Sequence, residues 1–273
     1  MRDGRGTAGV LGIDVPDSLL EQWRGWYAPA VQPFPIERLD DGERALLPQR
    51  MLRPTPEVRD TFFLYRGPWA WLDEGEFRAL PSGLRRRLLG ARRQAMRPKP
   101  SPVWPSELAE AGDAPLWRWV EAGTPRSRHR DVTDQVWERC GQSLPHARAL
   151  VGTFPAGGSG ANCFATVLAA AGDTAAAERW VQGDEFGAWL RARTAPINSP
   201  ASDGDPGTVL VWREHGALAH AAVTIGGGWA LVKPSQAWCS PRLVQPTREL
   251  ILGWRHPGTR MERQGLVERA RAE

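Results

Sequence analysis

Residues 152–171 read GTFPAGGSGANCFATVLAAA, and this stretch decides how the C-terminal part of the chain is expected to fold. The first part, residues 152–162, is rich in glycine, and the second, residues 163–171, is small and apolar on every side. A helix without a polar face is typical of a protein interior, so we expect a buried helix that begins at Cys163. The field of a helix N-terminus favours a thiolate, and a glycine-rich loop lets a substrate backbone approach the sulfur closely. Cys163 is therefore a candidate nucleophile.

Three short runs of β-forming residues follow further along the chain. They read TVLVWR (residues 208–213), LAHAAVTI (218–225) and WALVK (229–233), with turn residues between them and the glycine triplet 226–228 before the third. This pattern predicts an antiparallel meander. His220 lies in the middle strand. A buried helix packed across the meander is expected to bring His220 within hydrogen-bond reach of Cys163, where the imidazole can act as a general base.

The residues just before Cys163 are candidates for a substrate-binding loop, and they include Ser159, Gly160 and Asn162. Backbone N–H groups near Asn162 and Cys163 are expected to form part of an oxyanion hole. The sequence has no H-E-x-x-H or other metal-ligand spacing and no phosphate-binding loop of the G-x-x-x-x-G-K type. We therefore expect neither a metal ion nor another cofactor.

The order of these features resembles a known family. A helix-borne Cys is followed by G-T-V-L-V-W (residues 207–212) and then by H-A-A-V-T-I-G-G-G (220–228). This looks like the papain-like fold of bacterial cell-wall endopeptidases of the NlpC type and their amidase relatives. The resemblance covers about residues 157–245. It implies a nucleophile role for Cys163 and a general-base role for His220.

The chain departs from that family at the third catalytic position. The family places a polar residue on the strand after the hairpin, where it orients the His, and this place falls on Val232. Strand alternation puts Lys233 on the opposite face from Val232. Gln236 is the better chemical substitute, because its side-chain carbonyl can accept a hydrogen bond from an imidazole N–H. Gln236 is therefore the candidate orienting residue, although a Cys–His pair alone can suffice.

These residues predict a cysteine-nucleophile hydrolase or acyltransferase that acts on an amide or peptide bond through an acyl-thioenzyme. The expected substrate is a peptide or a small amide. One alternative is a catalytically inactive papain-like binding or interaction module, which Val232 favours. Another is a serine hydrolase that uses Ser159, although G-G-S-G-A is one residue short of the G-x-S-x-G elbow. Cys140 and Cys239 have no comparable context and are interpreted as structural.

The composition limits the other classes of function. The chain of 273 residues is 41% hydrophobic and 24% charged, as expected for a globular protein. Its sequence pI is about 9.4, yet the basic residues are nearly all Arg, and Lys occurs only at Lys99 and Lys233. No Arg cluster is interleaved with aromatic residues as in a nucleic-acid-binding module, so no nucleic-acid partner is expected. The sequence leaves the oligomeric state open.

The cysteine usage and the hydropathy bear on localisation. The three Cys are an odd number without a C-x-x-C pair, which favours free thiols and a reducing compartment. No apolar run approaches the ~20 residues of a membrane helix, and the N-terminal residues do not resemble a signal peptide. We therefore expect a cytoplasmic protein without a membrane partner, with export that needs no signal as the alternative.

We expect an α+β chain in two parts. Residues 1–150 are predicted to be a helix-rich, Pro-interrupted region of unknown role, with helices at 17–27, 82–96, 114–122 and 131–142 and a strand at 60–66. Residues 151–273 are predicted to form the papain-like cysteine hydrolase domain, with the Cys-bearing helix packed on an antiparallel sheet. Residues 246–273 are expected to be helical or frayed.

Overall fold

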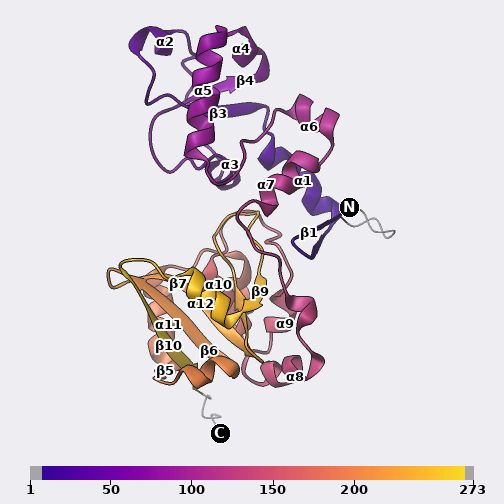
Figure 1. Cartoon of the computed structure of the whole chain (residues 1–273), viewed down its shortest axis with the longest axis vertical. Helices are drawn as coiled ribbons and strands as arrows, with labels where there is room; N and C mark the ends of the chain where they lie inside the picture. Colours follow the sequence, from indigo (N-terminus) through magenta and orange to yellow (C-terminus); the bar gives the residue numbers. More distant parts are fainter. Residues whose placement is uncertain (1–7, 268–273) are drawn as a thin grey trace. The chain divides into compact units, whose positions relative to one another are not determined.

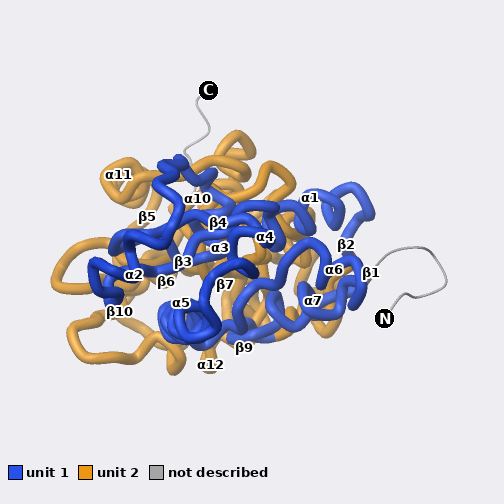
Figure 2. Tube along the Cα trace, turned by 90° about the horizontal axis from the view of Figure 1, so that it is seen from above, with its two compact units in different colours: residues 1–11, 15–125 blue, residues 12–14, 126–273 orange. Residues whose placement is uncertain are grey.

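The computed structural model describes residues 8–267 and divides the chain into two compact units. One unit comprises residues 1–11 and 15–125, and the other comprises residues 12–14 and 126–273 (Figure 2). The division after Pro125 lies before the boundary that we expected at residue 150. The reason is that Trp137, Cys140 and Leu144 are apolar side chains buried in the core of the second unit.

The first unit is helix-rich, as predicted. Its elements are β1 (Ala8–Val10), α1 (Asp17–Tyr27), β3 (Val31–Pro35), α2 (Asp41–Ala45), α3 (Pro56–Phe62), β4 (Trp69–Asp73), α4 (Glu74–Ala79), α5 (Ser82–Ala95), α6 (Pro105–Ala111) and α7 (Ala114–Glu121). The helices predicted at 17–27, 82–96 and 114–122 are confirmed. The strand β2 (Ile13–Val15) lies where the chain first passes from one unit to the other.

The first unit contains a small core of aromatic side chains. The strands β3 and β4 pair antiparallel, from Val31↔Asp73 to Pro35↔Trp69. Phe34 on β3 stacks on Phe77 of α4 with 5.0 Å between ring centroids, and Trp104 lies against both rings. Stacked and tilted aromatic pairs stabilise such a core beyond the area that they bury.

The predicted strand at 60–66 is wrong, because residues 56–62 form the helix α3. Thr55 is its N-cap and accepts a hydrogen bond from the Val58 N–H, and Pro56 occupies the first turn. Both are ordinary helix-start signals. The aromatic run that follows them suggested a strand, but the helix ends at Phe63 in a left-handed conformation.

The second unit is a six-stranded antiparallel sheet with helices (Figure 1). Its elements are η1 (His129–Asp131), α8 (Asp134–Ser143), α9 (Ala147–Leu150), α10 (Cys163–Ala170), η2 (Thr174–Glu178), α11 (Gly183–Arg193), β5 (Thr194–Pro196), η3 (Pro200–Gly204), β6 (Pro206–Glu214), β7 (Ala217–Gly226), β8 (Trp229–Val232), β9 (Leu243–Pro246), α12 (Thr247–Gly253) and β10 (Thr259–Leu266). The sheet order is β5-β10-β6-β7-β8-β9. The α+β class, the buried helix at Cys163 and the meander β6–β7–β8 are confirmed.

The C-terminal segment agrees with the prediction at the helix α12 and differs from it further on. Residues 259–266 form the strand β10, which pairs with β6 from Thr259↔Glu214 to Gly265↔Thr208 and with β5 on its other side. We expected a helical or frayed tail, because the polar sequence TRMERQGL lacks the alternating apolar residues that predict a strand. Residues 268–273 of that prediction lie outside the described residues.

The core of the second unit lies between the sheet and the helices α8, α10 and α11. It contains Cys163 and Phe164 of α10 together with Ala221 and Val223 of β7. The opposite face of the sheet carries Trp212 and His220, against which Trp254 packs. Each face of this sheet is thus covered by its own set of side chains.

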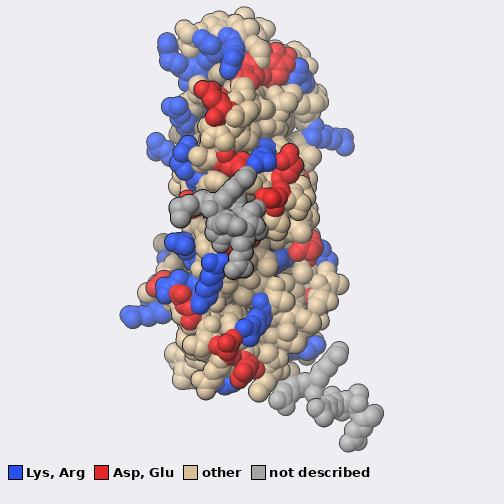
Figure 3. Space-filling model, turned by 90° about the vertical axis from the view of Figure 1, so that its right-hand side faces the viewer, with Lys and Arg blue, Asp and Glu red and all other residues tan. Residues whose placement is uncertain are grey.

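The surface carries both signs of charge. Positive and negative side chains are interspersed over the face drawn in Figure 3. Among the described residues, the longest helix is α5, and no helix has the length and apolarity that a membrane crossing requires.

Candidate active site

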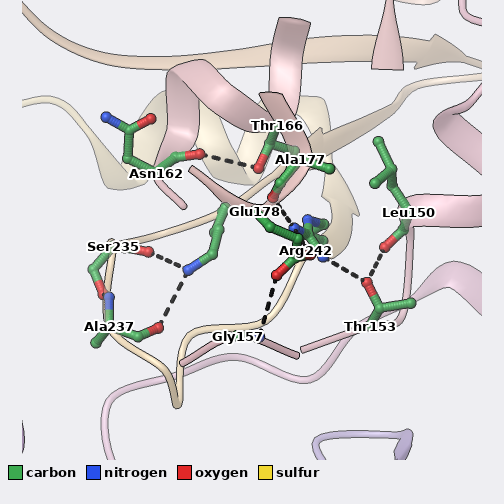
Figure 4. Close-up of polar contacts among 11 residues, drawn as sticks. Leu150, Thr153, Gly157, Asn162, Thr166, Ala177, Glu178, Ser235, Ala237 and Arg242 are labelled. Atoms are coloured by element: carbon green, nitrogen blue, oxygen red, sulfur yellow. Dashed lines mark hydrogen bonds and ion pairs between the residues drawn. The ribbon is translucent and has the colours of Figure 1, made fainter. Parts of the chain in front are cut away.

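Asn162 fixes the start of the helix that carries Cys163. Its side-chain oxygen accepts a hydrogen bond from the Ala165 N–H at 3.0 Å, and its side-chain nitrogen donates to the Val181 carbonyl at 2.8 Å. Its own carbonyl accepts from the Thr166 hydroxyl at 3.1 Å (Figure 4). An Asn that caps the first turn is a common helix start, so the sequence places Cys163 at the first helical position.

The Cys163 thiol experiences opposing influences. The residue is only 8% exposed, and this burial raises the pKa of the thiol to about 11. The backbone N–H groups of Ala221, Phe164 and Cys163 itself, together with the positive charge of Lys233, act to lower it. Burial disfavours the thiolate, whereas N–H groups and a nearby cation favour it. In this conformation the burial effect is the larger one.

His220 lies in an aromatic environment. Its ring stacks on Trp254 with 3.9 Å between centroids and an interplanar angle of 11°, and Trp212 lies 5.5 Å away. The residue is 2% exposed, and its Nε2 atom has no hydrogen-bond partner among the described residues. Burial lowers the pKa of His220 to about 3, so the ring is neutral near pH 7.

The structure does not bring His220 and Cys163 together in any contact between described residues, because the two side chains lie on opposite faces of the sheet. Ala221 and Val223 pack in the same core as Cys163, so regular alternation along β7 places His220 on the other face. The pairing of β6 with β7 shifts between Trp212↔His220 and Arg213↔Leu218, which leaves Ala219 as an extra residue. This β-bulge returns Leu218 to the face of Ala221 and is not what directs His220. Ala221, not His220, faces the helix that carries Cys163.

The predicted loop residues are tied to a second loop after β8. The Ser159 hydroxyl accepts a hydrogen bond from the Trp238 N–H at 3.1 Å, and the Gly160 N–H donates to the Gln236 carbonyl at 3.0 Å. The structure therefore brings Ser159, Gly160 and Gln236 together beside the start of α10. Gln236 was expected to orient His220, but this contact uses its main chain and lies on the Cys163 side.

Arg242 is a buried residue that the sequence analysis missed. It is 2% exposed, and it donates to the Thr153 hydroxyl at 3.1 Å, to the Glu178 carboxylate at 2.8 Å and to the Ala177 carbonyl (Figure 4). The Thr153 hydroxyl in turn donates to the Leu150 carbonyl at 2.6 Å. Arg242 thus anchors the chain that leads into the glycine-rich loop.

Lys233 is the other residue that the sequence analysis passed over as a site residue. Its side chain is fully buried, and Nζ donates to the carbonyls of Ser235 at 2.6 Å and Ala237 at 3.2 Å. Its rarity was a signal, because Lys occurs only twice in a chain rich in Arg.

Cys140 and Cys239 are buried like Cys163, and none of the three described cysteines forms a disulfide. Cys140 lies in the hydrophobic core, where burial raises the pKa of its thiol to about 12. Within residues 8–267, no group of three His, Cys, Asp or Glu side chains is placed to hold a metal ion.

A comparison with family models, with curated proteins and with solved structures finds no match for this chain.

Proposed function

We propose that the second unit is a thiol-dependent hydrolase or acyltransferase of papain-like design, with Cys163 as its nucleophile. One observation carries the proposal. The Cys163 sulfur lies at the N-terminus of a buried helix, where three backbone N–H groups and the charge of Lys233 favour the thiolate, while burial acts against it and is the larger effect in this conformation. Helix N-termini and nearby cations are the environments that make a cysteine nucleophilic.

The reaction has two balanced steps. The thiolate attacks the carbonyl carbon of an amide, and the amine leaves with a proton, so that an acyl-thioenzyme forms. Water or a second amine then displaces the sulfur, which gives hydrolysis or acyl transfer. The backbone N–H groups around Cys163 are suited to stabilise the oxyanion of each tetrahedral intermediate. The substrate class is a peptide or a small amide, and cell-wall peptides are the common substrate of the resembling family.

The role of His220 depends on its stacking. It can accept a proton from Cys163 only when its ring leaves Trp254, because no described contact joins the two residues. We therefore do not assign the base of the resting state to His220. Gln236 and Asn162 serve as loop and helix-cap residues in this proposal. The three free thiols agree with action in a reducing compartment such as the cytoplasm.

A second candidate function has a specific observation in its favour. The neutral, stacked His220 and the raised pKa of Cys163 are what a non-catalytic binding module would also have. A serine hydrolase has less support, because the Ser159 hydroxyl accepts the Trp238 N–H and holds the loop.

The experiment is the pH dependence of iodoacetamide labelling, resolved for each cysteine by peptide mass spectrometry. The proposal expects Cys163 to label at neutral pH at least about tenfold faster than Cys140, which is buried in the core. Equal, slow labelling of Cys163 and Cys140 would reject the nucleophile and favour the binding module. A serine-directed fluorophosphonate that labels Ser159 would favour the serine hydrolase instead.

A further inference from the structure

Three of the large apolar side chains that the first unit exposes line the same hollow. The segment 46–55 joins α2 to α3 (Figure 1), and residues 48–55 of it have no regular secondary structure. In this segment Met51 is 99% exposed and Leu52 is 42% exposed, and Tyr65, which follows α3, is 52% exposed. All three side chains line a hollow of about 410 Å³. Exposed Met and Tyr side chains around one hollow are typical of a binding surface.

Hydrogen bonds within the first unit hold two of the rings that line the hollow. The Tyr65 hydroxyl donates to the carboxylate of the buried Asp60 at 2.5 Å, and the Trp69 Nε1–H donates to the Arg66 carbonyl at 3.0 Å. Trp71, a third aromatic residue of the lining, is buried. Because the polar atoms of Tyr65 and Trp69 are satisfied within the unit, their rings present apolar faces that are already in place for a ligand.

The charge at the hollow is positive. Its lining contains Arg50 and Arg66 and neither Asp nor Glu. Arg50 pairs with Glu76 at 2.8 Å, whereas no ion pair among residues 8–267 includes Arg66. Glu37 lies outside the lining, with a carboxylate oxygen 4.0 Å from the position that a Cβ on Gly67 would take. One unpaired guanidinium beside an apolar hollow suits a ligand that joins a carboxylate to an apolar group.

This chemistry decides between the kinds of occupant. A second copy related by a two-fold axis would bring the same Arg side chains against one another. The segments 1–7 and 268–273 of this chain contain Arg but no aromatic residue and no Leu, Ile or Val. A nucleic acid binds through several phosphate contacts, and the hollow offers one unpaired cation. A peptide with an apolar side chain next to an acidic one matches both features of the hollow.

We propose that this hollow docks a short peptide segment of another protein. An aromatic or long aliphatic side chain of the peptide enters the hollow between Met51, Leu52 and Tyr65, and a neighbouring Asp or Glu pairs with Arg66. Such an anchor in a preformed hollow supplies most of the affinity of an interface. The proposal does not depend on the role of Cys163, because every residue that lines the hollow belongs to the first unit.

The probe is a phage-displayed library of short random peptides, selected on the immobilised full chain. The enriched peptides should share an aromatic or long aliphatic residue beside Asp or Glu. Their affinities are then measured by the fluorescence anisotropy of labelled synthetic copies. Leu52→Glu should weaken binding at least about tenfold and Arg66→Gln about threefold, and the effect of Arg66→Gln should disappear at about 1 M salt.

The chain offers a matched control for each variant. Leu252 is exposed to a similar extent as Leu52 but lies in the second unit, so Leu252→Glu should leave the affinity unchanged. Arg86 is an exposed Arg of the first unit outside the hollow, so Arg86→Gln should also have no effect. Met51→Glu separates binding from folding, because a side chain that is 99% exposed contributes no packing, and it should weaken binding as Leu52→Glu does.

Four outcomes would overturn the proposal. The first is a selection that enriches no peptide, and the second is a set of peptides that bind Leu52→Glu and Met51→Glu as tightly as the wild type. The third is a dimer in sedimentation velocity that Leu52→Glu dissociates, which would assign the hollow to a second copy. The fourth is a labelled single-stranded oligonucleotide that binds the wild type but not Leu52→Glu, which would assign it to a nucleic acid.

Discussion

The two faces of the six-stranded sheet differ in chemistry, although they share the same strands. One face presents Cys163 near backbone N–H groups, and on the other face His220 stacks on Trp254 with Trp212 tilted against its ring. Regular alternation along β7 puts Ala221 on one face and His220 on the other. A β-strand therefore does not define a catalytic pair until its register is known, because one residue of slip exchanges its faces.

The largest expected effect is the loss of stability when a packed side chain is removed from the sheet face that α10 covers. Phe164 is buried and stacks on Phe186 with 4.5 Å between ring centroids. We expect Phe164→Ala to lower the free energy of unfolding of the second unit by about 3–5 kcal/mol. Trp254→Ala, on the opposite face, should cost less, because Trp254 is only partly buried. Urea denaturation followed by circular dichroism measures both, and equal costs would contradict the difference between the faces.

The next effect is the pH dependence of stability that His220 causes. Its pKa is about 3 in the folded protein and about 6.5 in an unfolded chain, so the unfolded state binds a proton that the folded state excludes. Stability should therefore fall as the pH decreases from about 6.5 towards 3, by about 1.4 kcal/mol per pH unit.

The free energy of unfolding of the variant His220→Leu should not show this pH dependence. Between pH 7 and pH 5 the wild type should therefore lose about 2 kcal/mol more than the variant. Urea midpoints between pH 7 and pH 5 measure the difference. His256→Gln is the control, because His256 is exposed. A wild-type profile as flat as that of His220→Leu would show that the ring is not held neutral against Trp254.

A smaller effect is expected at the helix start that carries Cys163. Asn162→Ala removes the bond to Ala165 and leaves the buried Val181 carbonyl without its donor, so we expect a loss of about 1–2 kcal/mol. Thr133→Ala removes only the cap of α8 and should cost less. Thermal unfolding of both variants tests this order, and a larger cost for Thr133→Ala would contradict it.

The smallest effect is expected at Ser159. Loss of its bond to the Trp238 N–H should cost about 1 kcal/mol in Ser159→Ala. The pH profile of Cys163 labelling should remain that of the wild type, because the Asn162 cap at the helix start is unchanged. A variant that folds normally but loses all hydrolytic activity, with Cys163 still reactive, would return Ser159 to the role of nucleophile.

Much of the fold could be predicted from local sequence patterns. The helix at Cys163, the three strands of the meander and the helices at 17–27 and 82–96 each have a short-range signal of periodicity, composition or turn residues. The strand β10 could not be predicted in this way. Its polar residues become a strand because β5 and β6 provide hydrogen-bonding partners on both sides.

The sequence predicted the position of the candidate nucleophile but not the side chains that surround it. The sequence by itself determined that Cys163 begins a buried helix after a glycine-rich loop. The reason is that the Asn162 cap and the apolar residues that follow it specify the helix through neighbours within one or two turns. Only the tertiary structure decided which side chains meet the sulfur. The pairing of β6 with β7 puts His220 on the face of Trp212 and Trp254, and it puts Ala221 on the face that α10 covers. Register depends on pairing between residues distant in the chain, and a single sequence carries no local mark of it.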